Sequence, residues 1–344
     1  MAAASHQANT KFDVPNDAEL LQAQADLWRD SFSYQTAMAL RCAVKLGIPT
    51  AIHRLGGAAS IPDLIAALSL PPTKQPYLRR LMRLLSTTSA AFAADESDSD
   101  RYRLTPLSRT LVDGVDADDH HVQISVVLTV TSRQYVEAAM GLDDWFRKGD
   151  DISSSPPYDD VHGAEFDAVA NEALAAHDNQ GIGVVLRECG QELFGGVASL
   201  TDCGGGDGAT ARAVVSAFPH VRCTVLDLPK VIDKAPPAAD GAIHYLVLHF
   251  WSDDDCVKIL TQCKKAIPPQ KKGGKVIVID ILIGPSLGPA MFEAQILMDV
   301  AMMVNTRGRE RDENEWRDLF FKAGFSDYKI VKQLGVRAVF EVYP

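Results

Sequence analysis

The chain has 344 residues, of which 47% are apolar and 23% charged, and its formal net charge is −11 at pH 7. This length predicts two domains that each bury a core, and the acidic balance argues against general binding to nucleic acid or an anionic membrane. No apolar run reaches the roughly 20 residues of a membrane span, and residues 1–10 lack a signal or transit pattern, so we expect a cytoplasmic protein. The six cysteines are scattered without a C-x-x-C pair, so we expect reduced thiols and no metal site.

The first part of the chain predicts helices. Residues 1–17 have the composition of a disordered lead-in, and 17–46 predict one long helix that Gly47-Ile48-Pro49 ends. The apolar positions that recur along this helix at spacings of seven, seven and four are Leu20, Leu27, Tyr34 and Met38. A helix of this kind docks on a partner subunit or packs in a core, and both interpretations stay open.

Two shorter helices and a hairpin follow, which is the order of a winged helix. The helices are predicted over 61–68 and 74–85, and the hairpin lies around Tyr102-Arg103-Leu104-Thr105. The second helix carries Arg79, Arg80 and Arg83, which raises the hypothesis of DNA binding. Surface ion pairs in an acidic protein are the competing interpretation, and the one we favour. We place this domain at 18–118 and a second domain at 119–344.

The second domain alternates strands and helices from residue 197 onward, after a largely helical stretch over 120–190. This alternation predicts an α/β fold with a parallel, doubly wound sheet. The last two strands are separated by Leu334-Gly335, which predicts an antiparallel hairpin at the sheet edge. The six expected strands are 197–203, 222–227, 243–248, 274–282, 327–333 and 336–342.

A glycine-rich motif, Asp202-Cys203-Gly204-Gly205-Gly206-Asp207-Gly208, joins the first of these strands to a helix, and Asp227 ends the next strand. Glycines let the backbone turn sharply near a ligand, and an acid at the end of the second strand accepts hydrogen bonds from ribose hydroxyls. The loose pattern Gly204-x-Gly206-x-x-Ala209 allows NAD. Asp202 would repel a diphosphate but attract the ammonium group of S-adenosylmethionine, which we favour. A glycine turn that serves chain geometry alone is the third interpretation. The expected cofactor-binding residues are Asp202, Gly204, Gly206 and Asp227.

His249 follows the apolar run 245–248, at the predicted carboxyl end of a strand, where ligands of open α/β sheets bind. Histidine is suited to take a proton near neutral pH, which a phenol with a pKa of about 10 needs in order to react. A structural histidine is the alternative. Asp280 and Glu310 are candidate carboxylates that would fix the tautomer of His249. Glu310 has an alternative role as the ion-pair partner of Arg309 or Arg311.

Several short segments along nearly the whole chain carry a family resemblance: Glu19-Leu20-Leu21-Gln22-Ala23-Gln24, Tyr77-Leu78-Arg79-Arg80-Leu81-Met82-Arg83, Leu104-Thr105-Pro106, Asp227-Leu228-Pro229, Trp251-Ser252-Asp253, Glu310-Arg311-Asp312-Glu313 and Ala323-Gly324-Phe325. With these segments the chain resembles plant small-molecule O-methyltransferases of the caffeic-acid type. More narrowly, it is similar to the grass branch that includes acetylserotonin and benzoxazinone O-methyltransferases.

The resemblance implies a class I methyltransferase domain with a Rossmann-like sheet, an N-terminal winged-helix dimerisation domain and a homodimer. It also implies methyl transfer from S-adenosylmethionine to a hydroxyl of a small aromatic metabolite, which is phenolic, flavonoid or indolic, such as N-acetylserotonin. His249 falls on the family's catalytic base, and Asp280 and Glu310 fall on the two carboxylates beside it. The acceptor pocket falls on Phe166, His177, Met302, Met303 and Asn305.

The chain departs from the family in two places. Asp227 and His249 are only 22 positions apart, because a Gly-Asp-Met-Phe segment and a lysine on the adenine side of the cofactor are absent from the sequence. The sheet is therefore predicted to be one strand short. The family's His-Asp-Trp is here His249-Phe250-Trp251, and each lost buried hydrogen bond costs about 1–3 kcal/mol. The alternative to an active enzyme is therefore an impaired paralogue or splice form that acts as a dimer partner of active methyltransferases.

Overall fold

The computed structural model describes residues 15–95, 98, 100–114, 122–149, 155–163, 166, 181–203, 208–226 and 248–344. The chain divides into two compact units, an N-terminal unit up to Val112 and a C-terminal unit from Asp113. Within the described ranges, no helix combines the length and the apolar character that crossing a bilayer requires.

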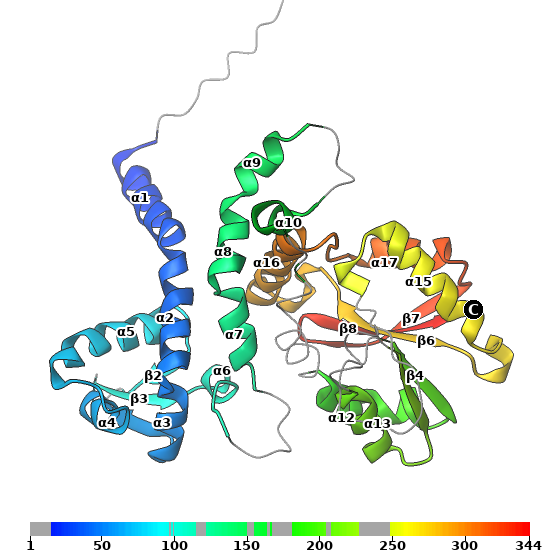
Figure 1. The fold of residues 1–344 in the computed structure, drawn as a ribbon, viewed down its shortest axis with the longest axis horizontal. Coiled ribbons are helices and arrows are strands. Elements are labelled where there is room, and N and C mark those ends of the chain that lie inside the picture. The colour runs from blue at the N-terminus through cyan, green and yellow to red at the C-terminus, as the bar shows by residue number, and fades with distance from the viewer. Residues whose placement is uncertain are drawn as a thin grey trace, which may run out of the picture. The chain divides into compact units, whose positions relative to one another are not determined.

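The N-terminal unit is a small helical domain with a three-stranded antiparallel sheet of order β1-β3-β2 (Figure 1). This is the predicted winged-helix arrangement. Its strands are β1 (Ala58–Ser60), β2 (Phe92–Ala94) and β3 (Arg101–Leu104). Its helices are α1 (Asp17–Ser31), α2 (Ser33–Leu46), α3 (Ile48–Arg54), α4 (Ile61–Ala67), η1 (Pro72–Lys74), α5 (Gln75–Thr87) and α6 (Pro106–Arg109).

The predicted single helix over 17–46 is wrong in one respect, because the chain leaves helical geometry at Phe32 (φ −100°, ψ 3°) and forms α1 and α2. A capping box of Asn16 and Glu19 begins α1, and Gly47 ends α2 in the left-handed conformation at φ 73°. The apolar side chains of α1 remain largely exposed in the single chain; Leu27, for example, is 64% exposed. Of the two interpretations left open, this exposure favours docking on a partner subunit.

The core of the N-terminal unit lies between its helices and the hairpin, where Ile52, Leu64, Met82 and Leu85 are fully buried. Arg79 on α5 donates to both carboxylate oxygens of Asp100 at 2.6 Å. For Arg79, the interpretation as an ion-pair residue is therefore confirmed.

In the described part of the C-terminal unit, the strands form two groups. β4 (Ser199–Cys203) pairs in parallel with β5 (Arg222–Leu226), and α13 (Ala209–Ala217) connects them. β6 (Val276–Ile281), β8 (Arg337–Tyr343) and β7 (Asp327–Leu334) form an antiparallel sheet with β8 in the centre, so the predicted edge hairpin is confirmed. Five of the six expected strands are present. The prediction for 243–248 falls mostly outside the described residues, and Leu248 is not in a strand but begins the 3₁₀ turn η2 (Leu248–Phe250).

Helices cover both faces of the β6–β8–β7 sheet (Figure 1). Side chains alternate across a strand, so Phe340 and Val342 of β8 contact the cluster of α15 and α17, while Val339 contacts the cluster of α12 and α13. The helices of the unit are α7 (Ile124–Val130), α8 (Arg133–Met140), α9 (Leu142–Arg147), α10 (Pro157–His162), α12 (Ile182–Phe194), α13, α15 (Asp253–Ala266), η3 (Gln270–Lys272), η4 (Pro285–Leu287), α16 (Pro289–Asn305) and α17 (Glu313–Lys322).

One buried amide fastens α16 to this sheet. Gln295 is fully buried, and its Nε2 donates to the carbonyl oxygens of Leu282 at 2.6 Å and Val336 at 3.1 Å. Its Oε1 accepts from the N–H of Gly284 at 3.0 Å. Helix α16 is thus tied both to the end of β6 and to the turn between β7 and β8.

Candidate active site

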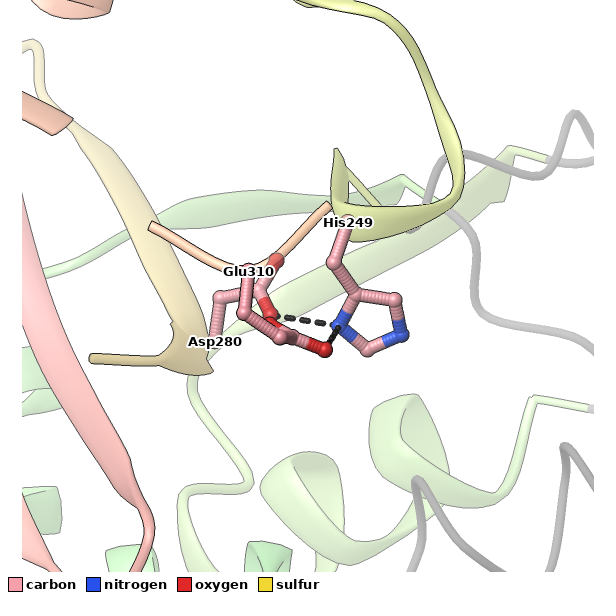
Figure 2. A group of neighbouring side chains, drawn as sticks. All are labelled: His249, Asp280 and Glu310. Carbon is pink, nitrogen blue, oxygen red and sulfur yellow. Dashed lines mark hydrogen bonds and ion pairs between the residues drawn. The ribbon is translucent and has the colours of Figure 1, made fainter. Parts of the chain in front are cut away.

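His249 lies in η2 and is only 3% exposed. The thiol of Cys256 on α15 donates to the carbonyl oxygen of Leu248 at 3.1 Å, which holds this turn on the first part of the helix. His249 Nδ1 lies 2.6 Å from Asp280 Oδ1 and 3.8 Å from Glu310 Oε1 (Figure 2). The structure therefore brings together the three residues predicted for the chemistry, from three separate segments of the chain.

The two carboxylates differ in how they are held. Asp280 is the next-to-last residue of β6, and its Oδ1 also accepts from the N–H of Ile281 at 2.8 Å. Glu310 lies in the loop between α16 and α17, and its carboxylate oxygens are buried without a hydrogen-bond partner among the described residues. The pKa of Glu310 is raised to about 7, mainly by burial; Asp280 and Asp299 act in the same direction, while His249 and Arg311 oppose them.

This arrangement fits a general base. A carboxylate on Nδ1 holds a proton there and leaves Nε2 to take another. In Figure 2, Nε2 lies on the side of the ring away from both carboxylates. The ring of Phe250 meets the imidazole edge-on, with 4.5 Å between centroids, and limits its rotation. The three side chains also offer ligand atoms within 4.8 Å of one another, a spacing that a cation can use, so the expectation of no metal stays a prediction.

The alternative ion pair for Glu310 is wrong. Arg309 pairs with Glu315, and Arg311 donates to Asp253 Oδ1 from Nε at 3.0 Å and from Nη2 at 2.8 Å. Arg311 is fully buried, and it also donates to the carbonyl oxygens of Trp251 at 3.0 Å and Arg309 at 3.1 Å. This structural role of Arg311 was not predicted from the sequence, where Arg311 was considered only as an ion-pair partner of Glu310.

On the cofactor side, the structure describes one of the four predicted residues. Asp202 is the next-to-last residue of β4; its Oδ2 is buried without a partner among the described residues, while a backbone hydrogen bond from Ala211 reaches its carboxylate. Burial raises its pKa to about 6. Such a carboxylate fits the cationic end of S-adenosylmethionine. The other three residues, Gly204, Gly206 and Asp227, lie outside the described residues.

Four of the five predicted acceptor residues are described, and His177 lies outside. Met302, Met303 and Asn305 lie at the end of α16, and Asn305 Oδ1 is buried without a partner among the described residues. Phe166 is buried in one cluster with Val304, which lies between Met303 and Asn305 in the sequence. The rings of Tyr135 and Tyr158 meet Phe166 edge-on at 5.8 and 5.2 Å. The sequence analysis missed these two tyrosines, because aromatic residues on short helices carry no distinct signal.

Sequence models of known families match both units. The O-methyltransferase dimerisation domain matches residues 28–114, and the O-methyltransferase domain matches 142–241 and 236–326. The chain is 58% identical to a flavonoid O-methyltransferase-like protein of Oryza sativa subsp. japonica, over 98% of this chain and 99% of that protein. It is 56% identical to daphnetin O-methyltransferase 1 of Secale cereale, over 94% and 99%.

Among solved structures, human N-acetylserotonin methyltransferase in complex with S-adenosylmethionine shares the fold, with a TM-score of 0.67, 20% identity and coverage of 97% of this chain and 99% of that one. The fold places the chain among class I methyltransferases with an N-terminal helical dimerisation domain. The chain belongs to the plant O-methyltransferase family, whose enzymes transfer methyl groups to oxygen.

The match to the O-methyltransferase domain is interrupted between Asp227 and His249. Its two pieces meet over 236–241. The alignment with the rice relative spans 373 positions, and the whole chain has 344 residues, so at least 29 aligned positions have no residue of this chain. The break in the family match falls in the interval where the spacing of Asp227 and His249 predicted a shortening.

Proposed function

We propose that the protein transfers the methyl group of S-adenosylmethionine to a hydroxyl of a small aromatic metabolite, with His249 as the general base. The observation that carries this proposal is the buried cluster of His249, Asp280 and Glu310, in which a carboxylate lies 2.6 Å from Nδ1. A base held in this way contributes about 10²–10⁴ in rate.

The roles of the residues follow from their contacts. Asp280 keeps the proton on Nδ1 and stabilises the imidazolium that forms when Nε2 takes the hydroxyl proton of the acceptor. Glu310, with a pKa of about 7, adds a second negative charge beside the ring as it ionises. When bound, S-adenosylmethionine supplies an electrophilic methyl group. The unpartnered oxygen of Asp202 would accept a hydrogen bond from the ammonium group of S-adenosylmethionine, and by resemblance Gly204, Gly206 and Asp227 hold the remainder.

The acceptor class is supported by the relatives and by the lining of the site. The most informative names among the relatives above are those of a flavonoid O-methyltransferase-like protein and a daphnetin O-methyltransferase, at 58% and 56% identity. Phe166 and Met302 would provide apolar contacts for an aromatic ring, and Asn305 Oδ1 would accept from a second hydroxyl. We therefore favour a phenolic acceptor with more than one hydroxyl over an indolic one.

The dimerisation domain and the exposed apolar side chains of α1 support a homodimer. Sedimentation of the purified chain tests this part of the proposal, and a monomer at micromolar concentration would contradict it.

Calorimetric titration of S-adenosylmethionine into the purified 344-residue protein tests the function, followed by assay with daphnetin, flavonoids and N-acetylserotonin. Micromolar binding and methylation of a phenol are expected. Asp227→Ala should weaken binding of the cofactor, and NADH serves as the control ligand that should not bind. A folded protein that neither binds the cofactor nor methylates any acceptor would overturn the proposal and leave a role as a dimer partner of active enzymes.

A further inference from the structure

Gly308 is buried in the loop between α16 and α17, and the backbone of His249 and Phe250 in η2 lies directly against it. A Cβ atom at this position would lie 1.7 Å from the carbonyl oxygen of His249 and 2.6 Å from its carbonyl carbon. The carbonyl carbon of Phe250 would also be 2.6 Å away. These neighbours are backbone atoms, which cannot turn aside as the end of a flexible side chain does. The position therefore requires the absence of a side chain.

Other hydrogen bonds fasten the same loop. Asp299 on α16 accepts the N–H of Glu310 at 2.9 Å. Arg311 donates to the carbonyl oxygen of Trp251 and to Asp253, which follow His249 by two and four residues. Gly308 itself donates its N–H to Thr306 Oγ1 at 3.0 Å. Arg311 thus holds the loop that carries Glu310 against the segment that follows His249, and Asp299 holds the same loop on α16.

Neither carboxylate oxygen of Glu310 has a hydrogen-bond partner among the described residues, and Oε1 faces His249 Nδ1 at the longer distance of an ion pair, 3.8 Å. Its distance from the imidazole is therefore set by the backbone of the loop. How closely that backbone can approach depends on what occupies position 308.

We propose that Gly308 is a positioning residue for the base, because its missing side chain lets the loop approach His249 and sets the 3.8 Å separation between Glu310 Oε1 and His249 Nδ1. This inference rests on the proposed role of His249 as the base. A Cβ at position 308 forces the loop outward by about 1–2 Å, since ordinary contacts between carbon atoms are about 3.5–4.0 Å.

Charged groups from every neighbouring element face Glu310. They are His249 from η2, Asp280 from β6, Asp299 from α16 and Arg311 from its own loop. Moving the loop outward admits water and increases these distances, so the burial that disfavours the charged carboxylate is relieved. Glu310 then ionises at a lower pH.

The test is an NMR titration of the full chain labelled at glutamate Cδ, without cofactor or acceptor. The signal of Glu310 is assigned by its loss in Glu310→Gln. In the wild type it should show a step near pH 7. Gly308→Ala should lower the midpoint of this step by about one pH unit. The matched control is Gly196→Ala, because a Cβ at Gly196 meets nothing within 4 Å; it should leave the midpoint unchanged.

An unchanged midpoint in a folded Gly308→Ala protein would overturn the proposal. If that variant does not fold, the same titration of Thr306→Val tests the proposal. This substitution removes the hydrogen bond from the Gly308 N–H without a change of charge. A smaller shift in the same direction supports the inference, and no shift overturns it. The readout needs no turnover, so it separates this inference from the proposed function: a chain that methylates nothing still shows the step.

Discussion

The C-terminal unit has two regions that differ in how completely they are built. The base side consists of His249, Asp280 and Glu310, none of which is more than 3% exposed. The cofactor side consists of β4, β5 and Asp202, and along β4 the residues are exposed or half-buried. The break in the family match over 236–241 falls between these two regions. The base side rests on β6, β8 and α17, which share one hydrophobic cluster with Leu248, the residue before the proposed base. We therefore expect substitutions on the base side and on the cofactor side to affect proton transfer and cofactor binding separately.

The largest expected effect tests the base side. His249→Ala should lower the rate of methyl transfer by about 10²–10⁴, because the acceptor loses its general base, while the affinity for S-adenosylmethionine stays the same. Initial rates and calorimetry on the same preparation provide the two measurements. His53→Ala on α3 is the matched control, since His53 is exposed and lies in the N-terminal unit. Turnover at the wild-type rate would reject the assignment of the base.

Removal of Arg311 probes the framework around the base side. Arg311→Ala leaves the carbonyl oxygens of Trp251 and Arg309 without this donor and empties a buried volume, so the free energy of unfolding should fall by about 3–5 kcal/mol. Urea denaturation measures the loss. Arg317→Ala is the control, because Arg317 pairs with Asp318 at the surface, and it should cost less than about 1 kcal/mol. Equal losses in the two variants would show that Arg311 does not hold the loop.

A smaller effect is expected on the cofactor side. Burial raises the pKa of Asp202 from 3.8 to about 6, so the unfolded chain loses this proton at a lower pH than the folded one. The folded state is therefore destabilised as pH rises from about 4 to about 6, by at most about 3 kcal/mol. Asp202→Asn removes this penalty, so the cofactor-free variant should be more stable than the wild type at pH 7 and equally stable at pH 4.

Thermal unfolding of both proteins at the two pH values measures the difference, with the exposed Asp318→Asn as the control. The same Asp202→Asn variant should bind S-adenosylmethionine more weakly, because an amide does not attract its ammonium group as a carboxylate does. A variant that is less stable than the wild type at pH 7 would mean that the carboxylate has a favourable partner in the folded chain.

The sequence predicted most of the fold because strand and helix periods are local properties. It also predicted that His249, Asp280 and Glu310 share a site. Because the three residues lie far apart in the sequence, only the family resemblance placed them together. The break at Phe32 was missed because both flanking segments favour a helix and the residue itself gives no stop signal. The burial of Arg311 was missed because arginine is almost always exposed unless its partners are known, and those partners lie about 60 residues away. The need for glycine at 308 arises from a contact between distant backbones, which no local pattern records.

The amide of Gln295 has a consequence for how acceptor preference can change. It uses both hydrogens of its Nε2 and its Oε1, so glutamate, which lacks the donors, cannot replace it without losing both donated hydrogen bonds. Helix α16 therefore cannot slide or rotate on the sheet to fit a larger or smaller acceptor. We therefore expect a new specificity, in evolution or in the laboratory, to come from exchanging individual side chains such as the proposed acceptor residues Met302 and Met303, on a helix whose axis stays where it is.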